Sequence, residues 1–466
     1  MAQTQAHEPT TQRYVQTLWD VDSSDLPSET VAMTKRLTAD LIGCSVAGQR
    51  SPELDAVLDL AREQYAAGPA SIFGDPDRLS PIGAALANAT TGHGWDFDDT
   101  YDASPLHTSS SVVPATLALA QRTGATGAEI LRAAALGMET HVRLALACDT
   151  TIMDQGWHRT ALHGTFGATV AAAAILDLDV RTAENALSIA YSQTAGHIQV
   201  TEGGATKRFQ PGHASSSAVT AALLADKGLS GPPDPWFGRF GFYETYESNA
   251  YDDGIIFEDL GESWYVPDLS LKPYPCCRYM HTVIDAGLEL REEHGLSLSD
   301  IERATVYTNA DGHTACAEPP EPRYQPETFI HLQFNLPYAL ALPLVDGRPR
   351  IEHFTSDAVP RANDLPLERI ETAVTDEFDA EYADKISPAR VVVETTDGRS
   401  LEVTKIDPKG HPNNRMDDTE FRTKLEDCVA FSGLSVGSGV VADLLDLVED
   451  LEHLEEAEPI MALLEG

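Results

Sequence analysis

The sequence has little positive charge, and lysine is especially scarce. Its 466 residues include 8 lysines and 24 arginines against 73 acidic residues, a formal net charge of −41 at pH 7. Such a chain repels phosphate backbones, so we expect no nucleic-acid partner. The apolar fraction of 42% is typical of folded globular proteins, so the acidity does not indicate disorder. The lysine-poor, acidic composition resembles that of proteins adapted to high salt.

Long apolar runs and regularly spaced cysteines are also absent. No apolar run approaches about eighteen residues, and the stretch MAQTQAHEPT has no cationic part followed by an apolar core. We therefore expect a cytoplasmic protein that does not enter a membrane. The six cysteines form no CxxC pair, which argues against an iron–sulfur cluster or a zinc knuckle.

The order of apolar residues predicts a mainly helical chain. Helical spacing is found at 29–48, 81–92, 111–121, 127–148, 166–176, 183–194 and 213–227. Short alternating runs predict strands at Arg303–Asn309, Arg390–Thr396 and Ser400–Thr404, with an Asp-Gly hairpin turn between the last two. Helices are expected near 327–345 and 364–373, and again from Asp418 to the end.

This pattern predicts a large all-helical domain built from both chain ends, with a smaller α+β domain inserted between them. The expected boundaries are 1–268 and 409–466 for the helical domain and 269–408 for the α+β domain.

Four polar clusters are candidates for chemistry. The first, residues 93–107, lies between two helical segments and contains Asp96, Thr100 and His107. The second, a glycine-rich stretch at 156–167, contains His158 and His163, either of which could be structural. The third and fourth place cations just before expected helix starts, where carboxylates bind well. Their candidate residues are Lys207, Arg208, Lys272, Arg278 and Tyr279.

Residues 98–102 also satisfy DDxxD, the pattern with which helical isoprenoid synthases hold magnesium and diphosphate. Those enzymes need a second acidic motif on a facing helix, and the only similar string is Asp417-Asp418-Thr-Glu420. The structural alternative is that these carboxylates cap helices and hold turns.

Seven strings in this order resemble the MmgE/PrpD family. They are WDFDDTYDASPLH, VVPATLALA, GWHRTALHGTFGA, TKRFQPGHA, LKPYPCCRYMH, HLQFNLPYALA and PKGHPNN. The resemblance implies the architecture described above, usually as a homodimer. It also implies a lyase that acts on small polycarboxylates without metal or organic cofactor, such as 2-methylcitrate dehydratase or cis-aconitate decarboxylase.

By motif, the resemblance places the family's pocket residues on Asp96, Thr100, His107, His158, Lys207 and Lys272. Two departures from the decarboxylase branch favour another branch: a Thr100–His107 spacing one residue longer, and Cys277 where that branch has histidine. We therefore expect a 2-methylcitrate dehydratase-like hydro-lyase. In it, His107 oriented by Asp96 exchanges protons, His158 is the second donor, and Lys207, Lys272 and Arg278 hold carboxylates.

Alternatives remain open at this point. Within the family they are a decarboxylase or an isomerase/epimerase, and outside it the magnesium-dependent synthase or a non-catalytic carboxylate-binding protein. We expect the basic side chains to meet beside Asp96 and His107 in a crevice between two lobes.

Overall fold

A computed structural model describes residues 10–148, 155–382, 385–437 and 439–464. Contacts divide the chain into two compact units. Unit 1 comprises residues 1–94, 106–269 and 434–466, and unit 2 comprises residues 95–105 and 270–433. The N-terminal stretch that we expected to lack a targeting segment lies mostly outside the described residues.

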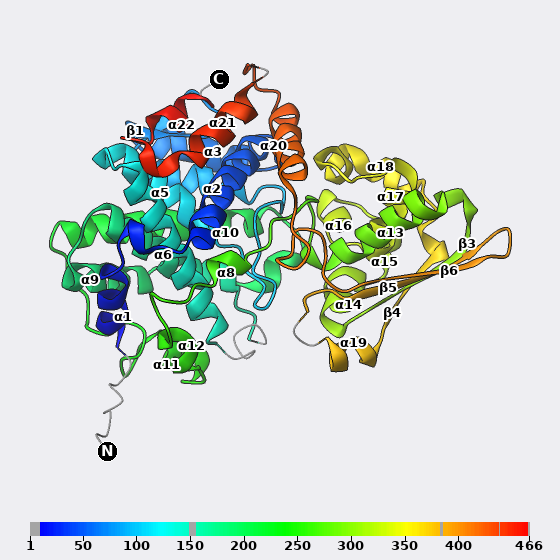
Figure 1. Ribbon diagram of the computed structural model, residues 1–466, viewed down its shortest axis with the longest axis horizontal. Helices are drawn as coiled ribbons and strands as arrows, with labels where there is room; N and C mark the ends of the chain where they lie inside the picture. Colours follow the sequence, from blue (N-terminus) through cyan, green and yellow to red (C-terminus); the bar gives the residue numbers. More distant parts are fainter. Residues whose placement is uncertain (1–9, 149–154, 383–384, 438, 465–466) are drawn as a thin grey trace. The chain divides into compact units, whose positions relative to one another are not determined.

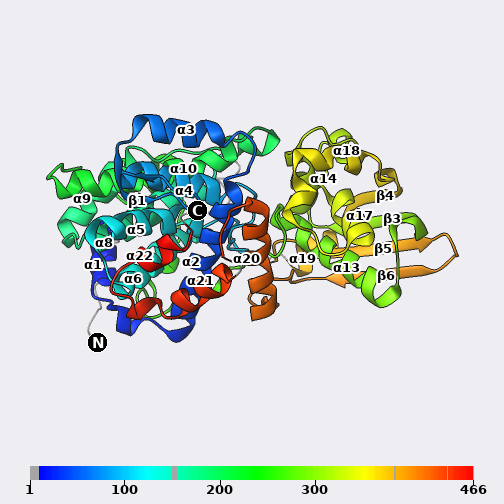
Figure 2. The same cartoon turned by 90° about the horizontal axis from the view of Figure 1, so that it is seen from above.

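Unit 1 is a multi-helix body (Figures 1 and 2). Its α-helices are α1 (Thr11–Trp19), α2 (Ser28–Gly48), α3 (Asp55–Gln64), α4 (Pro81–Gly92), α5 (Ser109–Thr123), α6 (Gly127–Leu146), α8 (Arg159–Ile175), α9 (Val180–Tyr191), α10 (Thr206–Asp226), α11 (Phe242–Glu247), α12 (Asp253–Phe257), α21 (Val440–Glu449) and α22 (Glu458–Ala462). Short 3₁₀ turns are η1 (Ser23–Asp25), η2 (Ile198–Glu202), η3 (Val266–Asp268) and η9 (Leu451–His453).

Helix α10 lies at the centre of unit 1 and packs against α4, α5, α8 and α9. Small residues permit this close packing: a Cβ on Gly212 would lie 2.0 Å from Thr90 Oγ1 of α4.

The seven helices predicted for the first half are confirmed, with two starting much earlier than expected. Helix α8 begins at Arg159 and α10 begins at Thr206, so Lys207 and Arg208 lie inside a helix and not before it.

One prediction for this part is wrong, because unit 1 is not all-helical. Strands β1 (Ala67–Ser71) and β2 (Arg78–Leu79) form a small antiparallel hairpin. Strand β1 is short and contains glycine and proline, and β2 has only two residues, so neither carries an alternating apolar pattern.

Unit 2 is built on a four-stranded sheet of order β4-β3-β5-β6. Its strands are β3 (Ile301–Thr308), β4 (Ile370–Val374), β5 (Ala389–Thr395) and β6 (Ser400–Lys405). Strand β4 is parallel to β3, and the other neighbours are antiparallel. Helix α13 (His281–His294) packs along β5 and β6 and against α17 (Leu336–Asp346), as Figure 2 shows.

The remaining helical elements of unit 2 are short, except for the last. They are η4 (Arg278–Met280), η5 (Leu298–Asp300), α14 (Ala310–Ala317), α15 (Glu321–Tyr324), α16 (Phe329–Gln333), η6 (Ile351–Phe354), η7 (Ser356–Ala358), α18 (Val359–Asn363), η8 (Leu367–Arg369), α19 (Asp376–Glu381) and α20 (Asp418–Ser432).

The strands predicted at 303–309, 390–396 and 400–404 are confirmed as β3, β5 and β6. The helix predicted at 364–373 is wrong, since most of its second half is the edge strand β4, a run of only five residues that is too short to carry a clear pattern. The helix predicted at 327–345 is broken into α16 and α17. In the β5–β6 turn only Gly398 has positive φ, 86°, which fits a three-residue loop and not the two-residue turn expected.

The predicted domain boundaries stay a prediction. Contacts group residues 95–105 and 409–433 with unit 2, whereas we expected both to belong to the helical domain.

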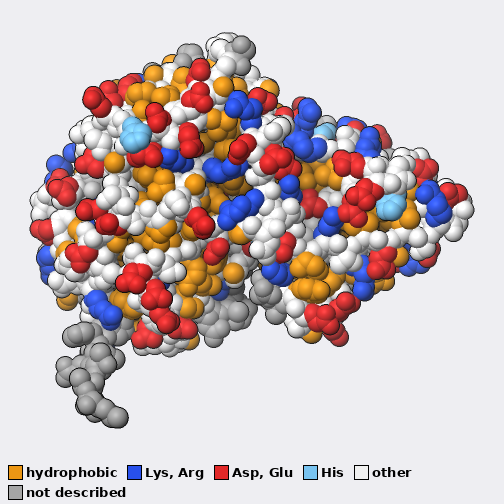
Figure 3. Space-filling view, in the orientation of Figure 1, with side chains coloured by type: hydrophobic (Ala, Val, Ile, Leu, Met, Phe, Trp, Pro, Cys, Tyr) orange, Lys and Arg blue, Asp and Glu red, His pale blue; other side chains and the backbone are white. Residues whose placement is uncertain are grey.

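The surface carries the acidic excess of the sequence. Figure 3 shows Asp and Glu side chains spread over the visible face, with Lys and Arg between them. Among the described residues, no helix combines the length and apolar character needed to cross a bilayer.

Candidate active site

Unit 1 brings Lys207 and His107 to the same imidazole, that of His93. Lys207 Nζ lies 3.0 Å from Nε2 of His93, the residue that ends α4. An ammonium group can only donate, so His93 Nε2 is the acceptor and this imidazole is neutral. The ring centroid of His107, just before α5, lies 4.6 Å from that of His93. Lys207 and His93 are buried and His107 is half-buried.

A second predicted histidine of unit 1, His158, precedes α8 and is held by α10. Its Nδ1 lies 2.6 Å from Gln210 Oε1, and Gln210 Nε2 donates to the carbonyl of His197 at 3.0 Å. Because that carbonyl fixes the orientation of the amide, Oε1 accepts a proton carried on His158 Nδ1. His158 Nε2 then carries the lone pair in the neutral ring.

The two histidine groups are linked through α8 and α10. Lys207 and Gln210 are three residues apart on α10 and share a face of that helix. The backbone N–H of His107 donates to Thr160 Oγ1 at 3.2 Å, two residues after His158. Unit 1 therefore gathers three of the predicted site residues, His107, His158 and Lys207. Together with their neighbours His93 and Gln210 we call them the histidine cluster.

Arg208 and His163 are also buried in unit 1, but they do not belong to the histidine cluster. Arg208 is buried, but neighbouring helix positions point about 100° apart, so it leaves α10 in another direction from Lys207. His163 is buried with Nε2 3.3 Å from Cys148 Sγ, and burial holds its pKa well below the ordinary value. A permanently neutral ring of this kind fits the structural interpretation of His163.

In unit 2, Lys272 is paired with Asp96. Lys272 Nζ donates to the Asp96 carbonyl at 2.9 Å and also forms an ion pair with its carboxylate. Both side chains are at most 2% exposed. Asp96 has φ 56°, in the left-handed region that is costly for a residue with a side chain. The double contact with Lys272 explains how this conformation is held.

The ion pair decides the charge state of Lys272. Burial by itself would lower the pKa of Lys272, but the carboxylates of Asp96 and Asp98 outweigh it and the pKa is raised. Lys272 is therefore a fixed cation at neutral pH and is unsuited to act as a general base.

Three consecutive carbonyls of this loop, those of residues 95–97, each accept a hydrogen bond from a side chain of unit 2. The donors are Gln333 Nε2 at 2.8 Å, Lys272 Nζ at 2.9 Å and Lys424 Nζ at 2.7 Å. All three donors are buried, and Lys424 also lies 4.2 Å from the centroid of the Phe97 ring. The loop that carries Asp96 is thus fixed along its backbone.

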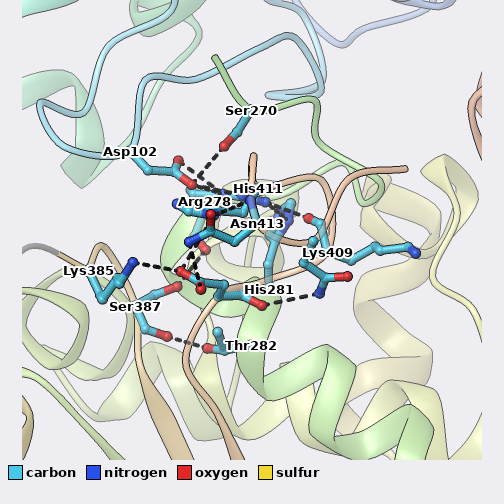
Figure 4. Close-up of polar contacts among 12 residues, drawn as sticks. Asp102, Ser270, Arg278, His281, Thr282, Lys385, Ser387, Lys409, His411 and Asn413 are labelled. Atoms are coloured by element: carbon cyan, nitrogen blue, oxygen red, sulfur yellow. Dashed lines mark hydrogen bonds and ion pairs between the residues drawn. The ribbon is translucent and has the colours of Figure 1, made fainter. Parts of the chain in front are cut away.

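Arg278, also in unit 2, is paired with Asp102 (Figure 4). Its Nη2 and Nε lie 2.8 Å and 3.1 Å from the two carboxylate oxygens of Asp102, and Ser270 Oγ donates to the same carboxylate at 2.8 Å. Nη1 donates to the Lys409 carbonyl at 2.8 Å and lies 3.1 Å from His281 Nδ1. Each guanidinium nitrogen therefore has a partner within the protein, and the predicted role of Arg278 in substrate binding stays a prediction.

Thr100 and Tyr279 occupy the same part of unit 2. Thr100 exchanges two backbone hydrogen bonds with Ser270, at 2.9 Å and 2.7 Å, and its side chain is buried. Tyr279 is half-buried, and burial raises the pKa of its hydroxyl, so the phenol stays protonated. Tyr279 is therefore available as a donor.

The acidic residues of the DDxxD string do not form an open carboxylate surface. Asp98, Asp99 and Asp102 are all buried, and Asp102 is neutralised by Arg278. The second string serves a helix start, because Asp417 accepts from the Glu420 N–H in the capping box of α20. The second string is therefore better explained as a helix cap. Without it, the hypothesis of a magnesium and diphosphate site has no second acidic motif.

Sequence reasoning missed His93, Gln210, Asp102 and Lys424. His93 and Asp102 lie within the polar cluster already singled out, so only their partners were unknown. Gln210 lies in a matched string, one turn after Lys207. Lys424 had no such signal beyond the scarcity of lysine, since its contact with the Phe97 carbonyl joins distant parts of the sequence.

Comparisons with known proteins cover most of the chain. Residues 13–252 match the family model described as MmgE/PrpD N-terminal domain, and residues 274–435 match the MmgE/PrpD C-terminal domain. The chain is 27% identical over 468 residues to the cis-aconitate decarboxylase of Aspergillus terreus, which covers 95% of this chain and 93% of that protein. For the cis-aconitate decarboxylase of Homo sapiens the identity is 25% over 454 residues, covering 95% and 91%. For the 2-methylcitrate dehydratase of Escherichia coli (strain K12) it is 27% over 268 residues, covering 54% and 53%.

Proposed function

The chain belongs to the MmgE/PrpD family, and on this premise we propose that it is a lyase acting on a small di- or tricarboxylate. The observation that carries the proposal is the pair of buried lysines, Lys207 in contact with His93 and Lys272 paired with Asp96. Burying a cation costs free energy unless the cation pairs with an anion. A polycarboxylate substrate supplies several negatively charged groups for such pairing.

The proposed step is proton transfer at a carbon next to a carboxylate. His158 suits the part of base, because Gln210 holds the proton on Nδ1 and leaves the lone pair on Nε2. His107 with Asp96 stays our proposed acid–base pair. Lys207 and Lys272 would hold substrate carboxylates and stabilise the enolate-like charge that forms when the C–H bond breaks.

In a dehydration the base takes the proton, the C–O bond breaks, and a second donor protonates the departing hydroxyl to give water and a double bond. We propose this reaction on a 2-methylcitrate-like acid as the first candidate. The departures at Cys277 and in the Thr100–His107 spacing support it, as does the similarity to a 2-methylcitrate dehydratase.

Decarboxylation of a cis-aconitate-like acid is the second candidate. Here the C–C bond to a carboxylate breaks, carbon dioxide leaves, and a histidine protonates the resulting carbanion. The observation in its favour is that the decarboxylases are similar over 95% of this chain, whereas the dehydratase matches over 54%.

Residues 95–105 join the two groups of side chains along the chain. His93 is three residues from Asp96, so their α-carbons are within about 11 Å of each other whatever the arrangement of the units. We propose that the two groups of side chains act on one substrate. We also propose that the protein is a homodimer, that it is adapted to high salt and that it works without a cofactor.

The test is a panel of citrate, 2-methylcitrate and cis-aconitate incubated with the purified protein. New ultraviolet absorbance from a conjugated double bond would identify dehydration, and release of carbon dioxide would identify decarboxylation. His158→Gln should abolish either signal, while His294→Gln, an exposed histidine of α13, should leave it unchanged. Binding without turnover would favour the carboxylate-binding alternative and refute the lyase.

A further inference from the structure

Unit 2 contains a cavity that the proposed reaction does not use. Its volume is about 440 Å³, within the usual range for small-molecule sites. It lies among α14, α15, α17 and β4, and none of the predicted site residues lines it. Its polar lining is formed by His313, Glu318, Arg323, Tyr324 and Thr372.

Arg323 is the unusual group in this lining. It is only 7% exposed, yet its one described side-chain hydrogen bond is from Nη2 to the Glu318 carbonyl at 2.7 Å. Its Nε is buried and has no hydrogen-bond partner among the described residues. A guanidinium has five N–H donors, and leaving them unmet in a buried place is costly.

No carboxylate of the described residues forms an ion pair with the Arg323 guanidinium. Burial lowers the pKa of Arg323, and only the thiols of Cys316 and Cys277 act against that shift. The guanidinium still remains protonated at neutral pH, because its ordinary pKa is above 12. Within the part of the chain that the structure describes, Arg323 is thus a buried cation without a carboxylate partner.

The other lining groups fit a small polar ligand. The Thr372 hydroxyl lies 3.4 Å from His313 Nε2, and the Tyr324 hydroxyl donates to the Ile370 carbonyl at 3.3 Å. Prolines supply rigid apolar walls. The one carboxylate of the described lining, Glu318, is 59% exposed and lies 3.5 Å from His313 Nδ1.

We propose that this cavity binds a small oxyanion, a carboxylate or a phosphate group, through the Arg323 guanidinium. The planar fork of arginine matches two oxygens of either group, which would meet the donors that the protein leaves unmatched. The proposal does not rest on the proposed function, and a protein inactive toward every acid of the panel would still show it.

The experiment is isothermal titration calorimetry of the full chain with inorganic phosphate and, separately, malonate, at fixed salt. Arg323→Gln should abolish one binding site or weaken it at least about tenfold, as expected for losing charge-assisted hydrogen bonds. Arg303→Gln is the matched control, because it removes the same charge from an exposed residue of β3 and should bind as the wild type does. Arg323→Lys should bind with intermediate affinity, since it keeps the charge and loses the fork.

Binding of phosphate alone or malonate alone identifies the source of the oxyanion, and either supports the site. Unchanged affinity and stoichiometry in Arg323→Gln, or no binding of either probe to the wild type, overturns it. Glu318→Gln provides a test that does not require Arg323→Gln to fold. Removing this carboxylate should tighten binding several-fold, and unchanged binding in this variant also counts against the site.

Discussion

The candidate site residues of the two units have contacts of different kinds. In unit 2, Lys272 and Arg278 are each paired with a carboxylate, Asp96 and Asp102. In the histidine cluster of unit 1, Lys207 contacts the imidazole of His93, and His158 contacts the side-chain amide of Gln210. The ion pair with Asp96 holds Lys272 in its charged form, whereas imidazoles can exchange protons near neutral pH, so we expect unit 2 to position groups and unit 1 to move protons.

The largest expected effect separates the two lysines by stability. Lys272→Met leaves the Asp96 carboxylate buried and unpaired, and we expect a loss of about 3–5 kcal/mol in the free energy of unfolding. Lys207→Met removes a contact with a neutral ring and should cost less, about 1–3 kcal/mol. Urea unfolding at fixed salt measures both. Adding Asp96→Asn to Lys272→Met should restore part of the loss, and equal losses for the two lysines would contradict the comparison.

The next effect concerns activity in unit 1. His107→Ala should lower turnover at least about a hundredfold, the lower end for losing a general acid–base group. The measurement is initial rate on whichever acid the panel identifies, with circular dichroism to establish folding. A folded variant with near-normal turnover would refute the role of His107.

A smaller effect tests the fixed loop of unit 2. Lys424→Met leaves the Phe97 carbonyl without its donor and should cost about 1–3 kcal/mol of unfolding free energy. It should also lower turnover, because the same loop carries Asp96. Lys405→Met is the control in the same unit, since its ion pair with Glu289 is about 30% exposed and should contribute no more than about 1 kcal/mol. If Lys424→Met matches that control in both stability and turnover, the loop does not depend on this lysine.

The smallest effect near neutral pH comes from a buried histidine of unit 1. Burial lowers the pKa of His141 from 6.5 to about 3. Between these values the unfolded chain binds a proton that the folded chain refuses, so stability falls as the pH falls from about 6.5 toward 3. The slope from this residue is at most about 1.4 kcal/mol per pH unit. Urea unfolding across this range should show a shallower decline for a folded His141→Gln, and an unchanged slope would exclude this residue as a source of acid sensitivity.

How well the sequence predicted the fold depended on how local each signal was. Helices such as α2, α4 and α6 follow from apolar spacing within single segments. The start of α10 was placed too late. The helix includes Pro211 in its second turn, where a proline removes one intrahelical hydrogen bond and leaves the others intact. Strand β4 was missed because an edge strand depends on its neighbour β3 more than on its own sequence.

For the candidate site, the sequence by itself determined which residue types are present. It supplied the histidines of the two polar clusters, the lysines that are rare elsewhere, and strings similar to those of the MmgE/PrpD family. Spacing along the chain could not tell which of these residues meet. The tertiary structure alone decided that Lys272 is paired with Asp96, that Arg278 is paired with Asp102, and that Lys207 lies against the imidazole of His93. These contacts join residues more than one hundred positions apart, and such pairings arise only when packing removes both partners from water and each must find the other.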